Sequence, residues 1–528
     1  MAGWTSRPGY RVYSDVVNIF DEIVSRHVRA GRGERLAIRD GDAILTYAEL
    51  ERAVERVSSG LARQGVQQGD KIVLRSRNTI RAIVSVLAAY RIGAVAVWSN
   101  SLLTEAEVEH VVENSQARLA LTTAELAAPL RAQKSAGNLD AIILLEGEPN
   151  DGELGYGSLD VTDADIVPAV ETKADDPAFM LYSSGTTGKA KGILHAHRWI
   201  ITVGDPALVQ TEFSPDDIVL TPGEMSFMGN FGHAFSFTLY AGASIALFNQ
   251  RATPAAVFEA IAQSQATVLA TVPTFYRTLL AAAQPPEKEK IASLRYALST
   301  GEVLGAATYE RWVSTYGIPL YEMSGVSEVE VLIGNGPAFD VKPGSIGRAM
   351  LGVKIELLNE QFEAVATGET GILMIHRSDP GLFLGYYRQP EKWRLQHRGD
   401  WYFTGDVMRR DEDGYFFTEG RADDLFKSRG YFISPVEIEE ILLKQPIVAE
   451  AAVVGLPDKT TGNLIAAFVV LRAEHEASDA LRDDLLGALR QTLAPYKIPK
   501  EITFVAELPK SPVGKILRRA LRTDPQAG

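Results

Sequence analysis

The first half of the chain alternates stretches of helical hydrophobic spacing with short runs that are apolar throughout. A capping box at Thr46 and Glu49 opens a segment whose apolar positions recur every three or four residues, which predicts an amphipathic helix. Strand candidates follow at 71–74 and 94–97, with another helix candidate at 83–89 between them. Alternation of this kind predicts an α/β architecture with a largely parallel sheet.

The pattern changes twice further along the chain. Residues 355–420 contain short strands separated by turn residues, which predicts an antiparallel sheet or a small barrel. Ser434 then caps a new helix, and strands and a second helix follow it. We therefore expect an α/β fold with a large N-terminal domain, 1–422, that includes a β-rich subdomain, and a small α+β domain, 423–528.

Composition narrows the function classes. The 528 residues are 46% hydrophobic and 23% charged, as in an ordinary soluble protein. The net charge of −14 argues against nucleic acid or an anionic membrane as the main partner, so local donors would have to hold any anionic substrate. The chain has no cysteine, which excludes disulfides, thiolate metal sites and a cysteine nucleophile. This usage suits a reducing cytoplasm, where we expect the protein.

One segment, 225–250, has no acidic or basic residue and is long enough to span a bilayer. It also contains Asn230, His233 and three glycines, a poor composition for a lipid-facing helix. We interpret it as buried strand, loop and helix around a pocket, and expect no membrane span. Charged residues such as Arg7 and Asp15 interrupt any secretory signal at the N-terminus.

The most informative segment is YSSGTTGKAKG at 182–192, which follows an apolar run. Its hydroxyls, its glycine amides, Lys189 and Lys191 can wrap polyphosphate oxygens, since glycine lets backbone N–H groups converge. The alternative is a flexible Gly/Ser/Thr linker. The Walker motif does not fit, because two residues rather than four separate Gly185 from Gly188.

Further motifs follow in order, and together they carry a family resemblance. They are STGE at 299–302, SGVSE at 324–328, YFTGD at 402–406, GRADDLFKSRG at 420–430 and PKSPVGKILRR at 509–519. With the glycine-rich loop and the histidines at 195 and 197, they resemble the adenylate-forming superfamily of acyl- and aryl-CoA synthetases, peptide-synthetase adenylation domains and luciferases. The segments 227–233 and 272–280 look most like the benzoate- and aminobenzoate-CoA ligase branch.

The resemblance implies the residues that handle ATP. Glu328, with Ser327 beside it, would bind Mg²⁺, and Asp406 with Arg421 would hold the ribose. Lys515 would bridge the substrate carboxylate and the α-phosphate; with Glu328 and Thr186 it forms the expected catalytic set. The expected ATP- and AMP-binding residues are Ser183, Ser184, Gly185, Thr186, Thr187, Gly188, Lys189, Gly301, Glu302, Ser327, Asp406, Arg421 and Lys515.

The resemblance also implies an acyl pocket and a mobile C-terminal domain. The C-terminal domain would rotate about Asp423 to present Ser428, Arg429 and Gly430 to the tunnel for the thiol. His233 either gates this tunnel or is a structural histidine, and both readings stay open. The expected acyl-pocket residues are Met228, Gly229, Phe231, His233, Gly325, Val331 and Leu332, an apolar set that suits an aromatic, alicyclic or medium-size acid.

The expected activity is an ATP-dependent carboxylate–CoA ligase that uses ATP, Mg²⁺ and coenzyme A. Two departures from the family pattern concern the nucleotide: Ser324 stands where an aromatic residue is usual, and Ser327 replaces a threonine. One alternative is a stand-alone adenylation enzyme that loads a carrier-protein phosphopantetheine. An alternative of another class is a non-catalytic nucleotide-binding regulator. A homodimer stays open.

Overall fold

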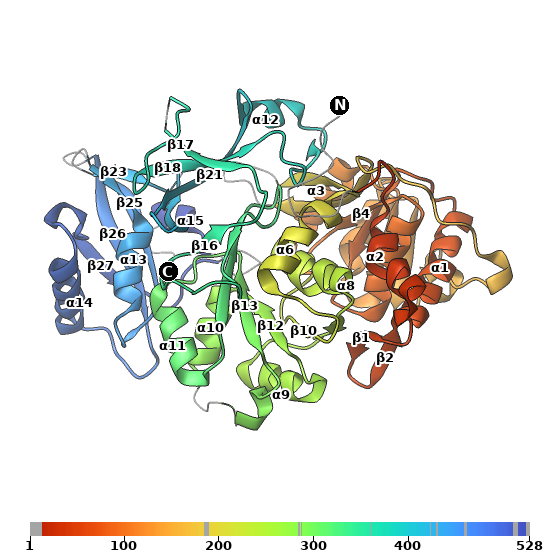
Figure 1. The fold of residues 1–528 in the computed structure, drawn as a ribbon, viewed down its shortest axis with the longest axis horizontal. Coiled ribbons are helices and arrows are strands. Elements are labelled where there is room, and N and C mark those ends of the chain that lie inside the picture. The colour runs from red at the N-terminus through yellow and green to blue at the C-terminus, as the bar shows by residue number, and fades with distance from the viewer. Residues whose placement is uncertain are drawn as a thin grey trace.

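The computed structural model describes residues 13–183, 190–282, 286, 288–359, 361–422, 424–428, 431–458, 462–510 and 516–523. The N-terminal elements lie at the right of Figure 1, in red and orange, and the C-terminal elements lie at its left, in blue. Two large sheets form the frame, and the described C-terminal residues add a two-stranded and a three-stranded sheet.

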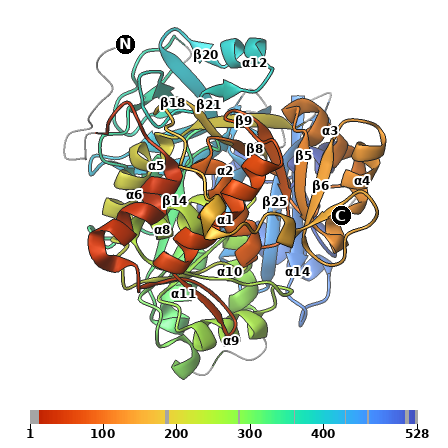
Figure 2. The same cartoon turned by 90° about the vertical axis from the view of Figure 1, so that its right-hand side faces the viewer.

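The first sheet is mostly parallel and is covered by helices on both faces. Ile72 and Leu74 belong to the core that includes α1 and α2, whereas Val73 packs with α3 and α4 on the other face. Figure 2 shows these two pairs of helices on opposite sides of the sheet. The capping box of Thr46 and Glu49 starts α1, as the sequence predicts. The strand order is β19-β9-β8-β4-β3-β5-β6-β7. The elements are α1 Tyr47–Arg63, β3 Lys71–Arg75, α2 Ile80–Arg91, β4 Val95–Trp98, α3 Glu105–Ser115, β5 Leu119–Thr123, α4 Ala128–Ser135, β6 Ala141–Glu146, β7 Leu154–Gly155, β8 Pro177–Ser183, β9 Lys191–Ala196 and β19 Gly385–Tyr386.

The second sheet has a parallel centre in which β11, β10, β12, β13 and β14 lie side by side. Strand β1 pairs with β11 in parallel and with β2 in antiparallel orientation. The elements are β1 Leu36–Asp40, β2 Ala43–Thr46, α5 Trp199–Thr202, α6 Gly204–Thr211, β10 Ile218–Leu220, β11 Ser244–Ala246, α9 Pro254–Ser264, β12 Val268–Thr271, α10 Pro273–Leu280, β13 Tyr296–Thr300, α11 Ala306–Tyr316 and β14 Leu320–Ser324.

The β-rich segment pairs in antiparallel orientation, as predicted, but it does not form a separate sheet or barrel. Through β15 and β16 it continues the edge of the second sheet beyond β14. Its apolar side chains are therefore buried against an existing core rather than against one another alone. The elements are β15 Ile333–Gly334, β16 Gly347–Ala349, β17 Ile355–Leu358, β18 Thr370–His376, α12 Pro390–Leu395, β20 His397–Arg398, β21 Trp401–Arg410 and β22 Tyr415–Arg421.

The C-terminal residues have a hydrophobic core of their own. Helix α13 starts as predicted, because the Ser434 hydroxyl accepts a hydrogen bond from the Glu437 amide, and Ile438 and Leu442 are fully buried. The boundary at Asp423 stays a prediction, and Asp423 lies outside the described residues. The elements are β23 Phe426–Ser428, β24 Tyr431–Ile433, α13 Pro435–Leu443, β25 Val448–Asp458, β26 Gly462–Leu471, α14 Asp479–Thr492, β27 Glu501–Phe504 and α15 Arg518–Thr523.

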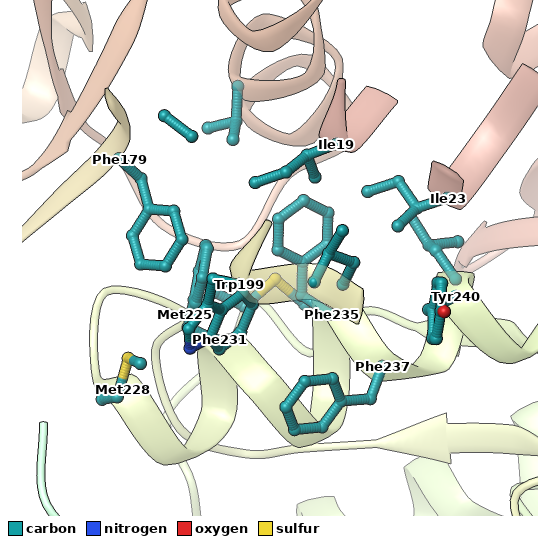
Figure 3. Packing of buried hydrophobic residues seen from close by; sticks show 14 of the residues in the cluster. Ile19, Ile23, Phe179, Trp199, Met225, Met228, Phe231, Phe235, Phe237 and Tyr240 are labelled. Atoms are coloured by element: carbon teal, nitrogen blue, oxygen red, sulfur yellow. The ribbon is translucent and has the colours of Figure 1, made fainter. Parts of the chain in front are cut away.

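The charge-free segment 225–250 is buried. It forms α7 Met228–Asn230, a π-helix at Phe231–Ser236, α8 Phe237–Ala241 and the strand β11. The ring centroid of Phe231 lies 4.6 Å from that of Phe179 and 5.6 Å from that of Trp199. Figure 3 shows these rings packed together. Within the described ranges no helix has the length and apolarity that crossing a membrane requires.

Candidate active site

Two of the predicted motifs, STGE and SGVSE, lie where neighbouring strands of the second sheet end. Strands β12, β13 and β14 are parallel, so the loops after Thr271, Thr300 and Ser324 emerge at one edge of the second sheet. Open α/β sheets bind ligands at this carboxyl edge. The loop after β3 reaches the same place, because the Asn78 side-chain amide donates to the Gly223 carbonyl at 2.9 Å. The carboxyl ends of both sheets therefore face one another.

The predicted phosphate loop connects β8 and β9, which pair in antiparallel orientation with Ser183 opposite Lys191. The loop is thus a hairpin connection that begins at the carboxyl end of β8. The other predicted residues of the loop, Ser184, Gly185, Thr186, Thr187, Gly188 and Lys189, lie outside the described residues.

His195 in β9 ties this hairpin to the loop after β14. Its Nε2 lies 2.9 Å from the Ser327 carbonyl, and its ring stacks on Phe179 with centroids 4.7 Å apart. Burial lowers the pKa of His195 to about 3, so the ring is neutral. A neutral ring with its Nε2 hydrogen directed at a carbonyl positions the Ser327–Glu328 backbone and does not transfer protons at neutral pH.

Glu328 is buried and paired. Its Oε1 lies 2.8 Å from the Lys191 ammonium and accepts a hydrogen bond from the Tyr386 hydroxyl at 2.7 Å. The Tyr386 hydroxyl also lies 2.7 Å from that of Tyr402. Burial alone would raise the pKa of Glu328, but the charge of Lys191 and the two hydrogen bonds outweigh it and hold this pKa below its ordinary value. Glu328 is therefore an anion at neutral pH.

A second ammonium adds to the positive charge beside the hairpin. Lys392 of α12 lies near Lys191 and Glu328, and burial together with the charge of Lys191 lowers the pKa of Lys392. Two cations against one carboxylate supply the local attraction for an anion that the net charge of the chain does not. Sequence reasoning assigned no role to these three residues: Lys392 and Tyr386 lie outside the motifs, and Tyr402 is the first residue of YFTGD, whose predicted function falls on Asp406 alone.

The donor set fits Mg²⁺ only in combination with substrate oxygens. No group of three His, Cys, Asp or Glu side chains able to hold a metal occurs in the part of the chain that the structure describes. Mg²⁺ commonly binds through one or two carboxylates plus phosphate oxygens and water. An ionised, buried Glu328 beside the predicted phosphate hairpin meets that requirement.

Asp406 and Arg421 lie opposite one another on the neighbouring strands β21 and β22. An Arg421 Nη1–H donates to Asp406 Oδ1 at 2.8 Å. Gly405 has φ +83°, and a Cβ there would lie 2.6 Å from Arg421 Nη2. The glycine of the YFTGD motif thus makes room for the guanidinium that orients Asp406.

Gly301 and Glu302 follow β13 directly, and Gly301 has φ +89° in the turn. The Thr274 hydroxyl donates to Glu302 Oε2 at 2.7 Å. On the adjacent strand Glu322 accepts a hydrogen bond from the Leu304 amide at 3.0 Å. Burial raises the pKa of Glu322 to about 8. The contact of Gly301 and Glu302 with adenine stays a prediction.

The expected acyl-pocket residues come from two segments that the fold brings together. A Cβ on Gly229 would lie 2.5 Å from the Thr300 methyl group, so the start of α7 lies directly against the end of β13. A Cβ on Gly325 would lie 1.9 Å from the Glu330 carbonyl oxygen. Phe231 joins the aromatic cluster, and Figure 3 shows Met228 at the margin of that cluster. His233, Val331 and Leu332 are buried nearby in sequence and space.

Glu330 is a functional candidate that the sequence analysis missed. It is 5% exposed, and its Oε1 lies 3.3 Å from His233 Nδ1. Burial raises the pKa of Glu330 to about 7. The sequence did offer a signal for Glu330, because it is a charged residue between the apolar residues Val329 and Val331, next to the predicted acyl pocket.

The C-terminal lobe lies against the edge that carries Glu302. Arg518 Nη2 of α15 lies 2.6 Å from Glu439 Oε2 of α13. The charge of Glu439 raises the pKa of Arg518 and burial lowers it. Asp424 and Glu302 also raise this pKa, and the net effect is a rise. The Ser428 hydroxyl donates to the Asn463 carbonyl within the lobe at 2.7 Å. Asp423, Arg429, Gly430 and Lys515 lie outside the described residues, so their expected roles stay predictions.

Two facing sheets that meet at a hairpin and a buried glutamate, with a small C-terminal lobe over their edge, are the architecture of adenylate-forming enzymes. The chain belongs to the AMP-binding enzyme family: the family model matches residues 25–387, and that of the AMP-binding enzyme C-terminal domain matches residues 437–515. The fold is the α/β fold of this family, with a large N-terminal and a small C-terminal domain.

Individual relatives are similar to this protein over nearly the whole chain. A benzoate–CoA ligase of Thauera aromatica is 34% identical over 96% of this chain and 96% of its own length. The anthranilate CoA ligase AuaEII in complex with anthranoyl-AMP has a TM-score of 0.90 and 29% identity, and the match covers 97% of this chain and 98% of that chain. ATP-bound MatB from Rhodopseudomonas palustris has a TM-score of 0.87 and 28% identity, over 96% and 98%. The protein is an AMP-forming acid–CoA ligase that binds ATP and a carboxylate.

Proposed function

We propose that the substrate is an aromatic, alicyclic or medium-size apolar carboxylic acid, which the protein converts first to acyl-AMP and pyrophosphate and then to acyl-CoA and AMP. The observation that supports the two-step reaction is the buried Glu328, ionised by Lys191, beside the β8–β9 hairpin. The relatives named for benzoate and anthranilate support an aromatic acid.

In the first half-reaction an oxygen of the substrate carboxylate bonds to the α-phosphorus, and the bond to the leaving pyrophosphate breaks. Two anions must meet, so the chain has to neutralise charge. Glu328 would hold Mg²⁺, which supplies positive charge to the phosphates when bound. Lys191 keeps Glu328 ionised, Asp406 accepts hydrogen bonds from the ribose hydroxyls, and Lys515 donates to the carboxylate and α-phosphate oxygens.

In the second half-reaction the sulfur of coenzyme A bonds to the acyl carbon, AMP leaves, and the thiol proton is released. We propose that the C-terminal lobe turns about Asp423 between the two steps, so that Lys515 leaves and Ser428, Arg429 and Gly430 approach the thiol. The internal bond from Ser428 to Asn463 moves with the lobe, so the turn does not require breaking it.

The acyl group would lie among Met228, Gly229, Gly325, Val331 and Leu332. Gly229 and Gly325 remove side-chain bulk where the two segments meet β13 and the turn before Glu330. Apolar walls suit a ring better than acetate, because burial of the ring supplies the binding free energy.

The test is a panel of acids incubated with pure protein, ATP and Mg²⁺, with pyrophosphate followed with and without coenzyme A. Release that requires benzoate or a similar acid, and thioester formation with coenzyme A, support the proposal. Release with acetate and none with ring or medium-chain acids contradicts the substrate class. Acid-dependent release without any thioester on coenzyme A favours a carrier-protein thiol, and nucleotide binding without release favours a regulator.

A further inference from the structure

Glu330 lies in a turn that the surrounding backbone determines. Its φ is +103°, a region that residues with a Cβ rarely adopt. Its amide donates to the Val326 carbonyl at 2.7 Å, and the Leu332 amide donates to the Ser324 carbonyl at 2.9 Å. Strain of this kind persists where neighbouring contacts hold it, and such residues cluster at ligand sites. The turn aims the Glu330 side chain at the π-helix that starts at Phe231.

A glycine allows the close approach of the carboxyl group. A Cβ on Gly232 would lie 1.5 Å from Glu330 Oε1, so no other residue fits at position 232 while Glu330 keeps its place. Gly232 sits within the π-helix Phe231–Ser236, a rare helix type that frequently occurs at functional sites. The backbone of the predicted acyl segment is thus shaped around this carboxyl group.

The carboxyl group is buried without enough donors. Neither oxygen of Glu330 accepts a well-formed hydrogen bond from any residue that the structure describes. His233 Nδ1 lies 3.1 Å from the Gly229 carbonyl oxygen and 3.3 Å from Glu330 Oε1, so it carries a hydrogen, and the carbonyl is the nearer acceptor. His233 Nε2 also has no hydrogen-bond partner among the described residues.

This arrangement leaves unpaired polar atoms buried among largely apolar residues. Buried acceptors without partners are costly, and native structures satisfy them with protein, water or ligand donors. Three buried polar atoms, the two Glu330 oxygens and His233 Nε2, therefore lack a hydrogen-bond partner among the described residues. An unsubstituted ring offers none.

We infer that Glu330 and His233 form a subsite that recognises a hydrogen-bond donor, an amino or hydroxyl group, on the ring of the acid. The inference rests on the proposed function, because it assumes that an aromatic acid occupies the pocket beside Gly229 and Gly325. Sites built to bond a polar substituent reject the analogue that lacks it, since their own buried groups would stay unpaired. Glu330 is thus a specificity-determining residue.

The experiment compares kcat/KM for benzoate with those for the three aminobenzoates and three hydroxybenzoates, measured by pyrophosphate release. The wild-type protein should prefer at least one donor-bearing acid by about 10-fold or more. Glu330→Leu removes both acceptors and should lower the preference for that acid over benzoate by about 10- to 100-fold. The value for benzoate itself should not fall by a similar factor.

Glu330→Gln guards against a variant that fails to fold, because it keeps the volume and one acceptor oxygen. Glu330→Gln should also lower the preference for the donor-bearing acid over benzoate. The new amide N–H₂ group is a donor, and it would face the donor on the ring of the acid. Glu212→Gln is the matched control: Glu212 also has a positive φ but is exposed and remote from the site, and its substitution should leave every ratio unchanged.

The outcomes separate this inference from the proposed function. A wild-type protein that releases pyrophosphate with none of these aromatic acids overturns the subsite, and it limits the proposed substrate class to alicyclic and aliphatic acids. One that activates benzoate at least as well as every amino- and hydroxybenzoate contradicts the subsite alone. Equal losses for all acids in both Glu330 variants would mean that the residue only supports the fold, and would also overturn the inference.

Discussion

Replacement of Lys191 by methionine tests how the structure keeps Glu328 ionised. Methionine has nearly the length of lysine but neither the charge nor the donor. In the wild-type protein the Lys191 ammonium lies 2.8 Å from Glu328 Oε1, with side chains only 15% and 8% exposed. The variant therefore leaves a buried carboxyl group with the Tyr386 hydroxyl as its remaining described donor on Oε1.

The magnitude follows from the distance and the burial. At an effective dielectric constant of about 20, unit charges 2.8 Å apart attract by about 6 kcal/mol. Desolvation of both groups offsets much of this attraction, so the pair itself adds little stability. Removal of one partner is different, because it leaves a buried charge unpaired and costs about 3–5 kcal/mol in the free energy of unfolding at neutral pH.

The pH dependence should change sign. In the wild-type protein the pKa of Glu328 is lowered, so its contribution to stability is present above the unfolded-state pKa and is lost as pH falls through the folded-state pKa. In Lys191→Met the burial term dominates and raises the pKa of Glu328. The variant should then lose stability as pH rises through this raised pKa, and the acid limb of its activity profile should move to higher pH.

Pyrophosphate release as a function of pH, together with urea unfolding at several pH values, measures both effects. The control is Lys290→Met, which removes a half-exposed lysine 3.0 Å from Glu259 and should leave the acid limb and the unfolding midpoint close to wild type. The reasoning is refuted if Lys191→Met keeps the wild-type acid limb and unfolds at the wild-type midpoint.

Three further substitutions probe other parts of the molecule. Lys515→Ala should abolish acyl-AMP formation but leave thioester formation from supplied acyl-adenylate largely intact; equal loss of both steps would contradict the rotating lobe. Asp406→Ala should raise the KM for ATP about 10-fold or more, through loss of hydrogen bonds to the ribose, while the KM for the acid changes little in steady-state assays. Glu322→Gln should flatten the pH dependence of urea unfolding. In the wild-type protein the raised pKa of Glu322, about 8, makes stability fall as pH rises from about 4.5 through 8. A wild-type-like pH slope in Glu322→Gln would mean that this carboxyl group is ionised in the native protein.

Local patterns in the sequence determine the elements whose signals are short-range. The capping box at Thr46 and Glu49, the Ser434 cap of α13 and the apolar run before the hairpin at Ser183 each concern neighbours within a few residues, and the structure has these elements there. The lack of charged residues around Phe231 also predicts that this stretch is buried, because charged side chains are costly in a core.

Tertiary structure alone decides which distant residues become partners. Lys191 and Glu328 are 137 positions apart and meet only because β9 and the loop after β14 belong to two sheets whose carboxyl edges face each other. Tyr386 joins them through the short strand β19 beside β9. Hydrophobic periodicity predicts which side of an element is buried but not which element covers it. Strand order depends on the crossover connections, and these have no periodic pattern in the sequence. For the same reason the approach of Glu330 to Gly232, in which a missing side chain on one segment admits the carboxylate of another, could be found only in the folded protein.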